Sequence, residues 1–222
     1  MGLFALITFL TVLIGSVLLA RSLKNFMPSD KRLYRDLEAL RAGMKEWPSE
    51  LVPISAEELD AFSLNQEERL VRRRFGTFAR GIFTTIYHEP VLAYRYKGYT
   101  GPGQKAILYA KTHDKDYSYI KDKKGVRIAA GQRQLGVLKE DGVLYAPNGK
   151  TAIAQLGQPA NQLLPVQMNE RELGSVVKEN NAEESGLGRR AFQFVPDDLE
   201  EHERDVFLAL ATLELVHRSL ES

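Results

Sequence analysis

The chain has 222 residues, long enough for one sizeable hydrophobic core beyond an N-terminal segment. It carries 30 Lys and Arg against 29 Asp and Glu, and this near-neutral balance argues against a nucleic-acid-binding protein. There is no cysteine, which excludes a disulfide framework, a lipobox lipoprotein, a thiolate metal site and a cysteine nucleophile.

The first twenty residues contain no charged side chain, and residues 3–20 form an almost unbroken apolar run. A helix rises about 1.5 Å per residue and the hydrocarbon core of a bilayer is roughly 30 Å thick, so about 20 apolar residues span it. No basic region precedes the run and no small-x-small cleavage site follows it, as a cleaved signal peptide would require. The sequence therefore predicts a transmembrane anchor over residues 1–22.

Basic residues that flank a membrane span are retained on its cytoplasmic side. Those that follow this run are Arg21, Lys24, Lys31, Arg32 and Arg35. We therefore expect a single-pass protein of the cell membrane whose C-terminal domain is cytoplasmic. An atypical signal sequence followed by a periplasmic or secreted domain remains the alternative.

Residues 23–66 are predicted to form a helical stalk between the anchor and the domain. Leu33, Leu37, Leu40 and Met44 make a single apolar stripe at helical spacing, and the helix is expected to end at Trp47-Pro48. A stripe this narrow packs on one partner surface. The sequence from Ser55 to Glu58 matches a capping box and predicts a second, short helix that extends to Phe62.

Residues 67–222 are predicted to form one β-rich domain. From Arg69 onward, short β-branched and aromatic runs are separated by Gly, Pro and Asn, a texture typical of antiparallel sheets. The strand candidates are residues 81–88, 91–97, 106–111, 126–130, 135–139, 143–145, 151–156, 164–168, 173–178 and 191–195. Asn148-Gly149 is the strongest hairpin signal because both residues tolerate positive φ.

The chain closes with a predicted helix that starts near Pro196 and has early carboxylates suited to its N-terminal dipole. Residues 206–216 are apolar around nearly the whole circumference, so this helix must be enclosed. Eleven residues span only about 16 Å, too short for a membrane. In a domain otherwise made of strands, we expect a sheet curled around this helix.

This arrangement resembles the tubby C-terminal-like superfamily, which includes tubby, phospholipid scramblase and LURP-one-related proteins. The residues that carry the resemblance are the Leu135-Gly136 and Leu173-Gly174 strand pairs, the strand 191–195 and the helix 206–216. The resemblance implies a mainly β fold, an antiparallel β-barrel-like domain closed around a hydrophobic C-terminal helix. Tubby proteins lack an N-terminal span, and this chain lacks the cysteine cluster of the scramblases, so scramblase activity is not carried over.

Charge is unevenly distributed along the chain. Residues 69–139 carry a net charge of +12, whereas residues 140–222 carry −8. A basic face beside a bilayer gains about 1 kcal/mol per well-placed Lys or Arg from anionic headgroups. The candidate contacts with anionic lipids are Arg72, Arg73, Arg74, Lys121, Lys123 and Lys124. The alternative is that these charges pair with the acidic C-terminal half of the same domain.

No catalytic residue, metal site or cofactor site is predicted. The four histidines fall in no metal-binding spacing. The stretch around Gly142 to Lys150 has six residues between its glycines, where a phosphate-binding loop has four, and a strand follows it.

We therefore expect a non-enzymatic, membrane-anchored module that binds anionic lipid headgroups or a membrane-associated partner. A structural or assembly protein that docks another protein at the membrane is the main alternative. An extracytoplasmic hydrolase with a convergent site is a third.

Overall fold

The computed structural model describes residues 2–26, 28–44, 51–55, 58–73, 76–101, 103–178 and 190–221. Two helices come first, α1 (Gly2–Phe26) and α2 (Asp30–Met44), and a short 3-10 turn, η1 (Leu59–Ala61), precedes the sheet. The strands are β1 (Phe62–Arg73), β2 (Gly76–Thr85), β3 (Pro90–Tyr99), β4 (Ala106–Lys111), β5 (Asp116–Asp122), β6 (Gly125–Ala130), β7 (Arg133–Leu138), β8 (Val143–Tyr145), β9 (Ala152–Leu156), β10 (Leu163–Met168), β11 (Arg171–Val177) and β12 (Phe192–Gln193). The helix α3 (Glu201–Glu221) ends the described chain.

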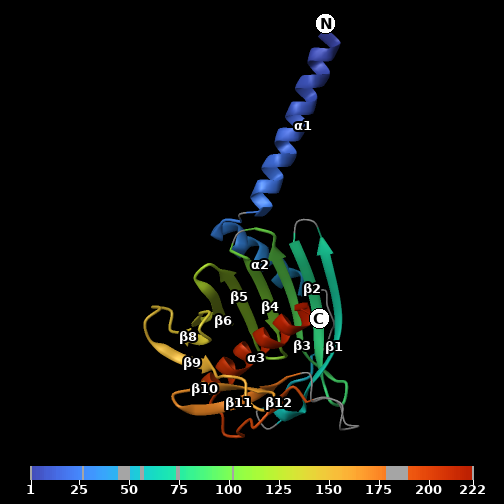
Figure 1. The fold of residues 1–222 in the computed structure, drawn as a ribbon. Helices are drawn as coiled ribbons and strands as arrows, with labels where there is room; N and C mark the ends of the chain where they lie inside the picture. Colours follow the sequence, from blue (N-terminus) through green and yellow to red (C-terminus); the bar gives the residue numbers. More distant parts are fainter. Residues whose placement is uncertain are drawn as a thin grey trace.

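The twelve strands form one antiparallel sheet in which each strand pairs with its neighbours in the sequence. The sheet curls into a nearly closed barrel (Figure 1). Its two ends meet where Ser63 of β1 bridges to Arg190, and the Ala191 N–H donates to the Phe62 carbonyl at 2.7 Å. The predicted mainly β, barrel-like fold is therefore confirmed at this level.

The core of the barrel is built around α3, which crosses its interior (Figure 1). All eight residues from Asp205 to Thr212 are buried, more than two full turns, so no side of this part of the helix faces water. The Phe207 ring packs against β11 at Gly174, where a Cβ would lie 2.9 Å from the ring. Gly174 also has φ +134°, so this position favours glycine.

Helix α2 lies on the outer face of the barrel. Its buried stripe of Leu33, Leu37 and Met44 packs against a second apolar cluster that includes Tyr99, Ile107, Tyr109 and Ile120. The predicted stripe thus has the single partner surface that it needs, and that surface is the sheet itself. Helix α2 is in this respect part of the barrel domain and not a free-standing stalk.

The segment between α2 and the sheet differs from its prediction. The capping contact exists, because the Ser55 N–H donates to Glu58 Oε2 at 3.0 Å, but only the three-residue turn η1 follows it. Residues 62–66, predicted to be stalk, begin the long strand β1. At the other end of the sheet, the predicted strand 191–195 is shortened to the two residues of β12.

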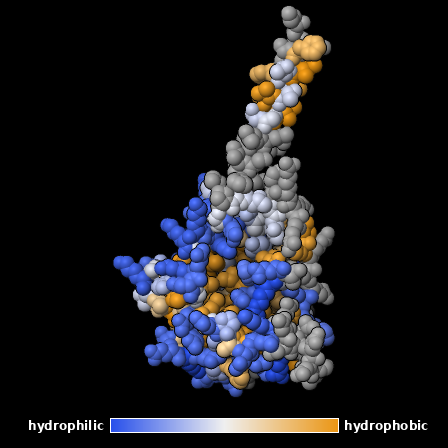
Figure 2. Space-filling model, viewed as in Figure 1, coloured by the Kyte–Doolittle hydropathy of each residue, from blue (hydrophilic) through white to orange (hydrophobic). Residues whose placement is uncertain are grey.

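Helix α1 covers the predicted anchor and projects away from the barrel (Figure 1). Its described apolar side chains are exposed, and Figure 2 shows hydrophobic residues on this helix interspersed with paler ones, above a barrel face where hydrophilic residues surround hydrophobic patches. Within the described residues, no helix is both long enough and apolar enough to cross a membrane. The side chains described in α1 are Phe4 and residues 6–17, and the transmembrane assignment of residues 1–22 stays a prediction.

Candidate functional site

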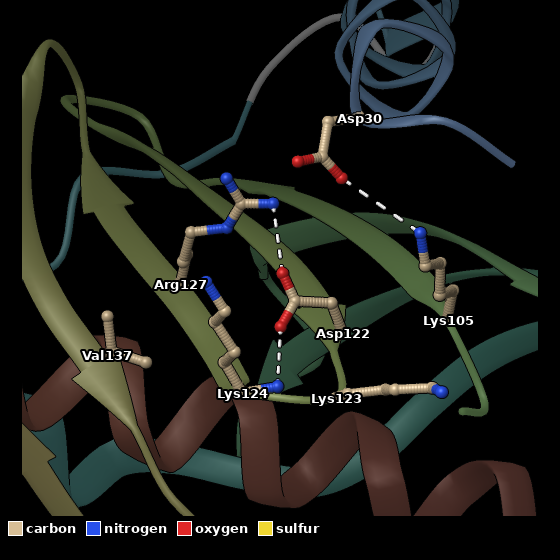
Figure 3. Close-up of a pocket in the computed structure, with 7 residues that line it drawn as sticks. All are labelled: Asp30, Lys105, Asp122, Lys123, Lys124, Arg127 and Val137. Atoms are coloured by element: carbon tan, nitrogen blue, oxygen red, sulfur yellow. Dashed lines mark hydrogen bonds and ion pairs between the residues drawn. The ribbon is translucent and has the colours of Figure 1, made fainter.

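A pocket of about 470 Å³ opens on the barrel near the junction of α1 and α2 (Figure 3). Four cationic side chains and two carboxylates line it together with Val137: Lys105, Lys123, Lys124, Arg127, Asp30 and Asp122. The cations come from the β3–β4 loop, from the β5–β6 turn and from β6, so separate parts of the +12 segment meet here. The four cations outnumber the two carboxylates, so the lining carries a net positive charge.

The β5–β6 hairpin places two adjacent lysines at the mouth of this pocket. Asp122 pairs with Gly125 across a two-residue turn made of Lys123 and Lys124. The Asp122 carboxylate accepts a hydrogen bond of 2.7 Å from the Lys124 backbone N–H, and Gly125 has φ +124°. The tight turn leaves both lysine side chains exposed, and among the described residues neither ammonium group has an ion-pair partner.

Lys105 connects the pocket to helix α2. Its Nζ donates to the Pro28 carbonyl at 2.8 Å and lies 4.0 Å from Asp30 Oδ1. Pro28 lies just before α2, so this one side chain holds the start of α2 against the barrel. The stem of Lys123 lies close by, because a Cβ on Gly103 would come within 2.9 Å of Lys123 Cγ.

Arg127 forms the wall of the pocket beneath α2. Its Nη1 donates to the Tyr34 hydroxyl at 3.0 Å, its guanidinium carbon lies 5.5 Å from the Tyr34 ring centre, and Nη2 lies 3.2 Å from Asp122 Oδ2. The Nε and Nη2 atoms make no hydrogen bond with the described residues. Tyr34 and Asp122 therefore hold the guanidinium in place, and Nη2 is ion-paired with Asp122 although it makes no hydrogen bond within the described part of the chain.

The six residues predicted to contact lipid do not all lie at one site in the structure. Lys123 and Lys124 line the pocket, whereas Lys121 projects to the inner face of the barrel and lines a different hollow. Arg72 and Arg73 belong to β1, but their side chains, like all of Arg74, lie outside the described residues. Lys121 lies on β5 and points inward like Tyr117 and Tyr119, whereas Lys123 and Lys124 form the turn beyond the end of that strand.

Lys105 and Arg127 were missing from the prediction, although both lie in the +12 segment. They are 22 residues apart and meet only because β4, β5 and β6 pair in a fixed register. One sequence signal existed: Arg127 follows the Lys123-Lys124 turn by three residues and belongs to the same hairpin. No comparable signal connects Lys105 to this turn.

Part of the basic segment pairs with the acidic C-terminal half, as the alternative reading required. Lys115 Nζ lies 2.7 Å from Glu201 Oε1 and 2.7 Å from Asp205 Oδ1, and Arg133 Nη2 lies 2.9 Å from Asp205 Oδ2. Lys115 precedes β5 and Lys124 follows it, so these ion pairs lie at the opposite end of the strand from the basic pocket. The pairing that the alternative required is therefore present at this end of the barrel. The contact of the other end with lipid stays a prediction.

Among the described residues, no group of three or more His, Asp or Glu side chains is arranged to hold a metal ion. Nor does any protein family, curated protein or solved structure match this chain. The basic pocket lies on the barrel beside the start of α2 and gathers cations from three separate parts of the chain.

Proposed function

We propose that this protein is a non-enzymatic module, tethered to a membrane by α1, that binds anionic lipid headgroups in the basic pocket. The observation that carries the proposal is the convergence of Lys105, Lys123, Lys124 and Arg127 at the end of the barrel from which α1 projects. A tether at this end holds the pocket next to the bilayer surface. The C-terminal barrel then lies on the cytoplasmic side, where anionic lipids concentrate.

The charges are sufficient for such binding. A Lys or Arg near an anionic surface contributes about 1 kcal/mol, so the two free lysines and two partly paired cations provide on the order of 2–4 kcal/mol. This is weak for a protein in solution. It is enough for a domain that α1 already confines to the surface, because tethering raises the effective concentration of the second contact.

The sequence of α1 supports the tether. Residues 3–20 form an almost unbroken apolar run without a charged side chain, and the described side chains from Leu6 to Val17 are exposed on the projecting helix. An exposed apolar rod of this kind calls for an apolar environment. The twelve-stranded barrel around α3 also supports the resemblance to the tubby C-terminal-like superfamily, which we retain as a proposal.

Energy transfer between the barrel and labelled lipids tests the proposal. The chain has no cysteine, so Glu140→Cys, an exposed site two residues beyond the end of β7, gives a unique attachment point for an acceptor dye. The full-length protein is placed in nanodiscs that contain a trace of donor-labelled phosphatidylserine or phosphatidylcholine. We expect higher transfer from phosphatidylserine, and we expect added salt to reduce the difference because salt screens exposed charges.

The decisive variant is Lys123→Glu with Lys124→Glu, which should abolish the preference for phosphatidylserine. The matched control is Lys111→Glu with Lys150→Glu, two exposed lysines outside the pocket whose replacement changes the net charge equally. Equal transfer from the two lipids, or a preference that survives the pocket variant, would instead favour the docking of a protein partner at the membrane.

A further inference from the structure

A second hollow, inside the barrel, follows from the register of the strands. Gly98, Ala106, Lys121 and Val126 are successive partners across β3, β4, β5 and β6. Gly98 has no side chain, and those of Ala106 and Val126 are small. The next inward-facing row, Tyr96, Leu108 and Tyr119, is much bulkier. The Tyr96 ring covers Gly98, because a Cβ there would lie 3.0 Å from the Tyr96 hydroxyl. The open space therefore lies beside Ala106, Lys121 and Val126, which line the hollow.

The opposite wall of this hollow is the last part of α3. Leu213, Val216 and Leu220 face it, and together with the strand residues they enclose about 180 Å³. Leu213 and Leu220 are only partly buried, in contrast to the fully enclosed stretch of α3 that precedes them. An apolar hollow with exposed leucine surface is a binding site for an apolar group.

Four polar or charged side chains also line the hollow: Gln104, Lys121, His217 and Glu221. Lys121 makes no ion pair or hydrogen bond with the described residues, and Gln104 lies in the exposed β3–β4 loop. His217 Nδ1 lies 3.6 Å from Glu221 Oε1, so these two side chains contact each other. Lys121 is therefore the one cation of this hollow without a partner among the described residues.

We propose that this hollow binds the chain of an aliphatic monocarboxylic acid of about six to eight carbons, with its carboxylate on Lys121. A 150 Å³ apolar cavity takes up benzene, which has six carbons, so about 180 Å³ holds roughly six or seven carbons of a chain. Lys121 is the single lysine of the lining, so it matches the one negative charge of a carboxylate better than the two charges of a phosphate. This site is independent of the basic pocket, which lies on the outer face of the same strands.

A photoreactive probe tests this site directly. The full-length protein, in nanodiscs or in buffer alone if α1 does not insert, is irradiated with octanoic acid that carries an aliphatic diazirine, and the modified peptides are mapped by mass spectrometry. We expect adducts on the α3 segment from Leu213 to Leu220. Excess octanoate should compete, whereas butyrate should compete far less, because each methylene buried raises affinity about fourfold.

Two variants distinguish this site from nonspecific partitioning. Val126→Phe fills the hollow and should reduce labelling at least tenfold, while the matched Val143→Phe, on β8 and outside the hollow, should leave it unchanged. Lys121→Glu, a change at a partly exposed position that leaves the core intact, should reverse the choice of competitor from octanoate to octylamine.

Labelling that survives Val126→Phe in a folded protein, or equal competition by octanoate and octylamine in the parent chain, would overturn the proposal. Because the basic pocket takes no part in these measurements, failure here leaves the headgroup experiment unaffected, and the reverse also holds.

Discussion

Asp205 is an acidic side chain buried inside the barrel, with 3 % of its surface exposed. Both of its oxygens receive a hydrogen bond from Lys115, and Arg133 donates a second one to Oδ2 at 2.9 Å. An uncompensated buried carboxylate costs several kcal/mol, so these two cations are what makes the position tolerable. They also connect the first turns of α3 to the strands that surround it.

We expect Asp205→Asn to lower the free energy of unfolding by about 3 kcal/mol or more, because it leaves the ammonium of Lys115 without its buried partner. Urea unfolding followed by circular dichroism measures the change. Asp197→Asn, at an exposed carboxylate just before α3, is the control and should stay within about 0.5 kcal/mol of the parent protein. A small effect at Asp205 would mean that the two cations reach water easily.

Asp36 carries out a similar role on the outer face, where α2 meets β3. Burial alone would raise the pKa of its carboxyl group, but hydrogen bonds from Lys97 Nζ at 2.6 Å and from the Tyr99 hydroxyl at 2.7 Å outweigh burial and lower that pKa below its usual 3.8. Burial and the nearby Asp36 carboxylate raise the pKa of Tyr99, so the phenol stays a donor over the working range of pH.

The sign of the pH effect follows from the lowered pKa of Asp36. Its contribution to stability is fully present above the unfolded pKa and is lost as the pH falls through the lower pKa of the folded state. Asp36→Asn should therefore destabilise the protein by about 1–3 kcal/mol at pH 7 and by progressively less as the pH is lowered below about 4. Paired urea titrations at several pH values measure this, with Glu38→Gln on the exposed side of α2 as control. A difference that does not change with pH would contradict it.

At the scale of the element, α3 changes character along its length. Every residue from Asp205 to Thr212 is buried, whereas Leu213 and Leu220, two of the three apolar α3 residues that face the hollow, are only partly buried; the third, Val216, is buried. The sequence predicted enclosure around 206–216 because apolar residues occupy all sides of that helix. It contained no sign of the change at Leu213, because that change depends on the small residues of β4 and β6.

An aspartate scan along α3 separates these two parts. Between Val206 and Ala211, each substitution by Asp should be severely destabilising without any 3.6-residue period, because each buries an unpaired carboxylate. Leu210→Ala should cost about 2–5 kcal/mol, and Leu213→Ala clearly less, since Leu213 is only partly buried. Thermal and urea unfolding of the single variants give the result. A tolerant face within residues 206–211 would mean that α3 packs on the outside of a sheet.

The strands show what local sequence determines. Asn148-Gly149 was predicted as a tight turn, and the structure has one there, with Gly149 at φ +70° and the Ala146 N–H bonded to the Thr151 carbonyl at 2.7 Å. Strand β1 was largely missed because its polar central residues lack the β-branched texture of the other strands. Its conformation is determined by pairing along most of β2, a contact between segments that no local signal specifies.

At the scale of the whole molecule, the positions of the charged side chains determine the surface that it presents more than their sum does. The +12 segment is partly neutralised by α3 at one end of the barrel, through Lys115 and Arg133, and keeps free lysines at the other end. The free lysines lie at the end nearest α1. A chain with a net charge of +1 can therefore present a basic surface in one direction, which neither the composition nor the order of charges in the sequence establishes.

The basic residues at the α1 end of the barrel also predict how the molecule is oriented in a membrane. If α1 spans a membrane, the basic residues from Arg21 to Arg35 and the basic pocket lie together on the side that holds the barrel, which the positive-inside rule assigns to the cytoplasm. A fluorescent reporter that matures only in the cytoplasm, fused after Ser222, should be active, and alkaline phosphatase at the same position should not. Changing Arg21 and Lys24 to Glu should shift part of the population toward the opposite orientation, whereas changing Lys111 and Lys150 should not, because those two lie far along the chain from the span. Phosphatase activity in the parent fusion would reverse the orientation, and it would place the pocket on the side where the anionic surface of the cytoplasmic leaflet cannot attract it.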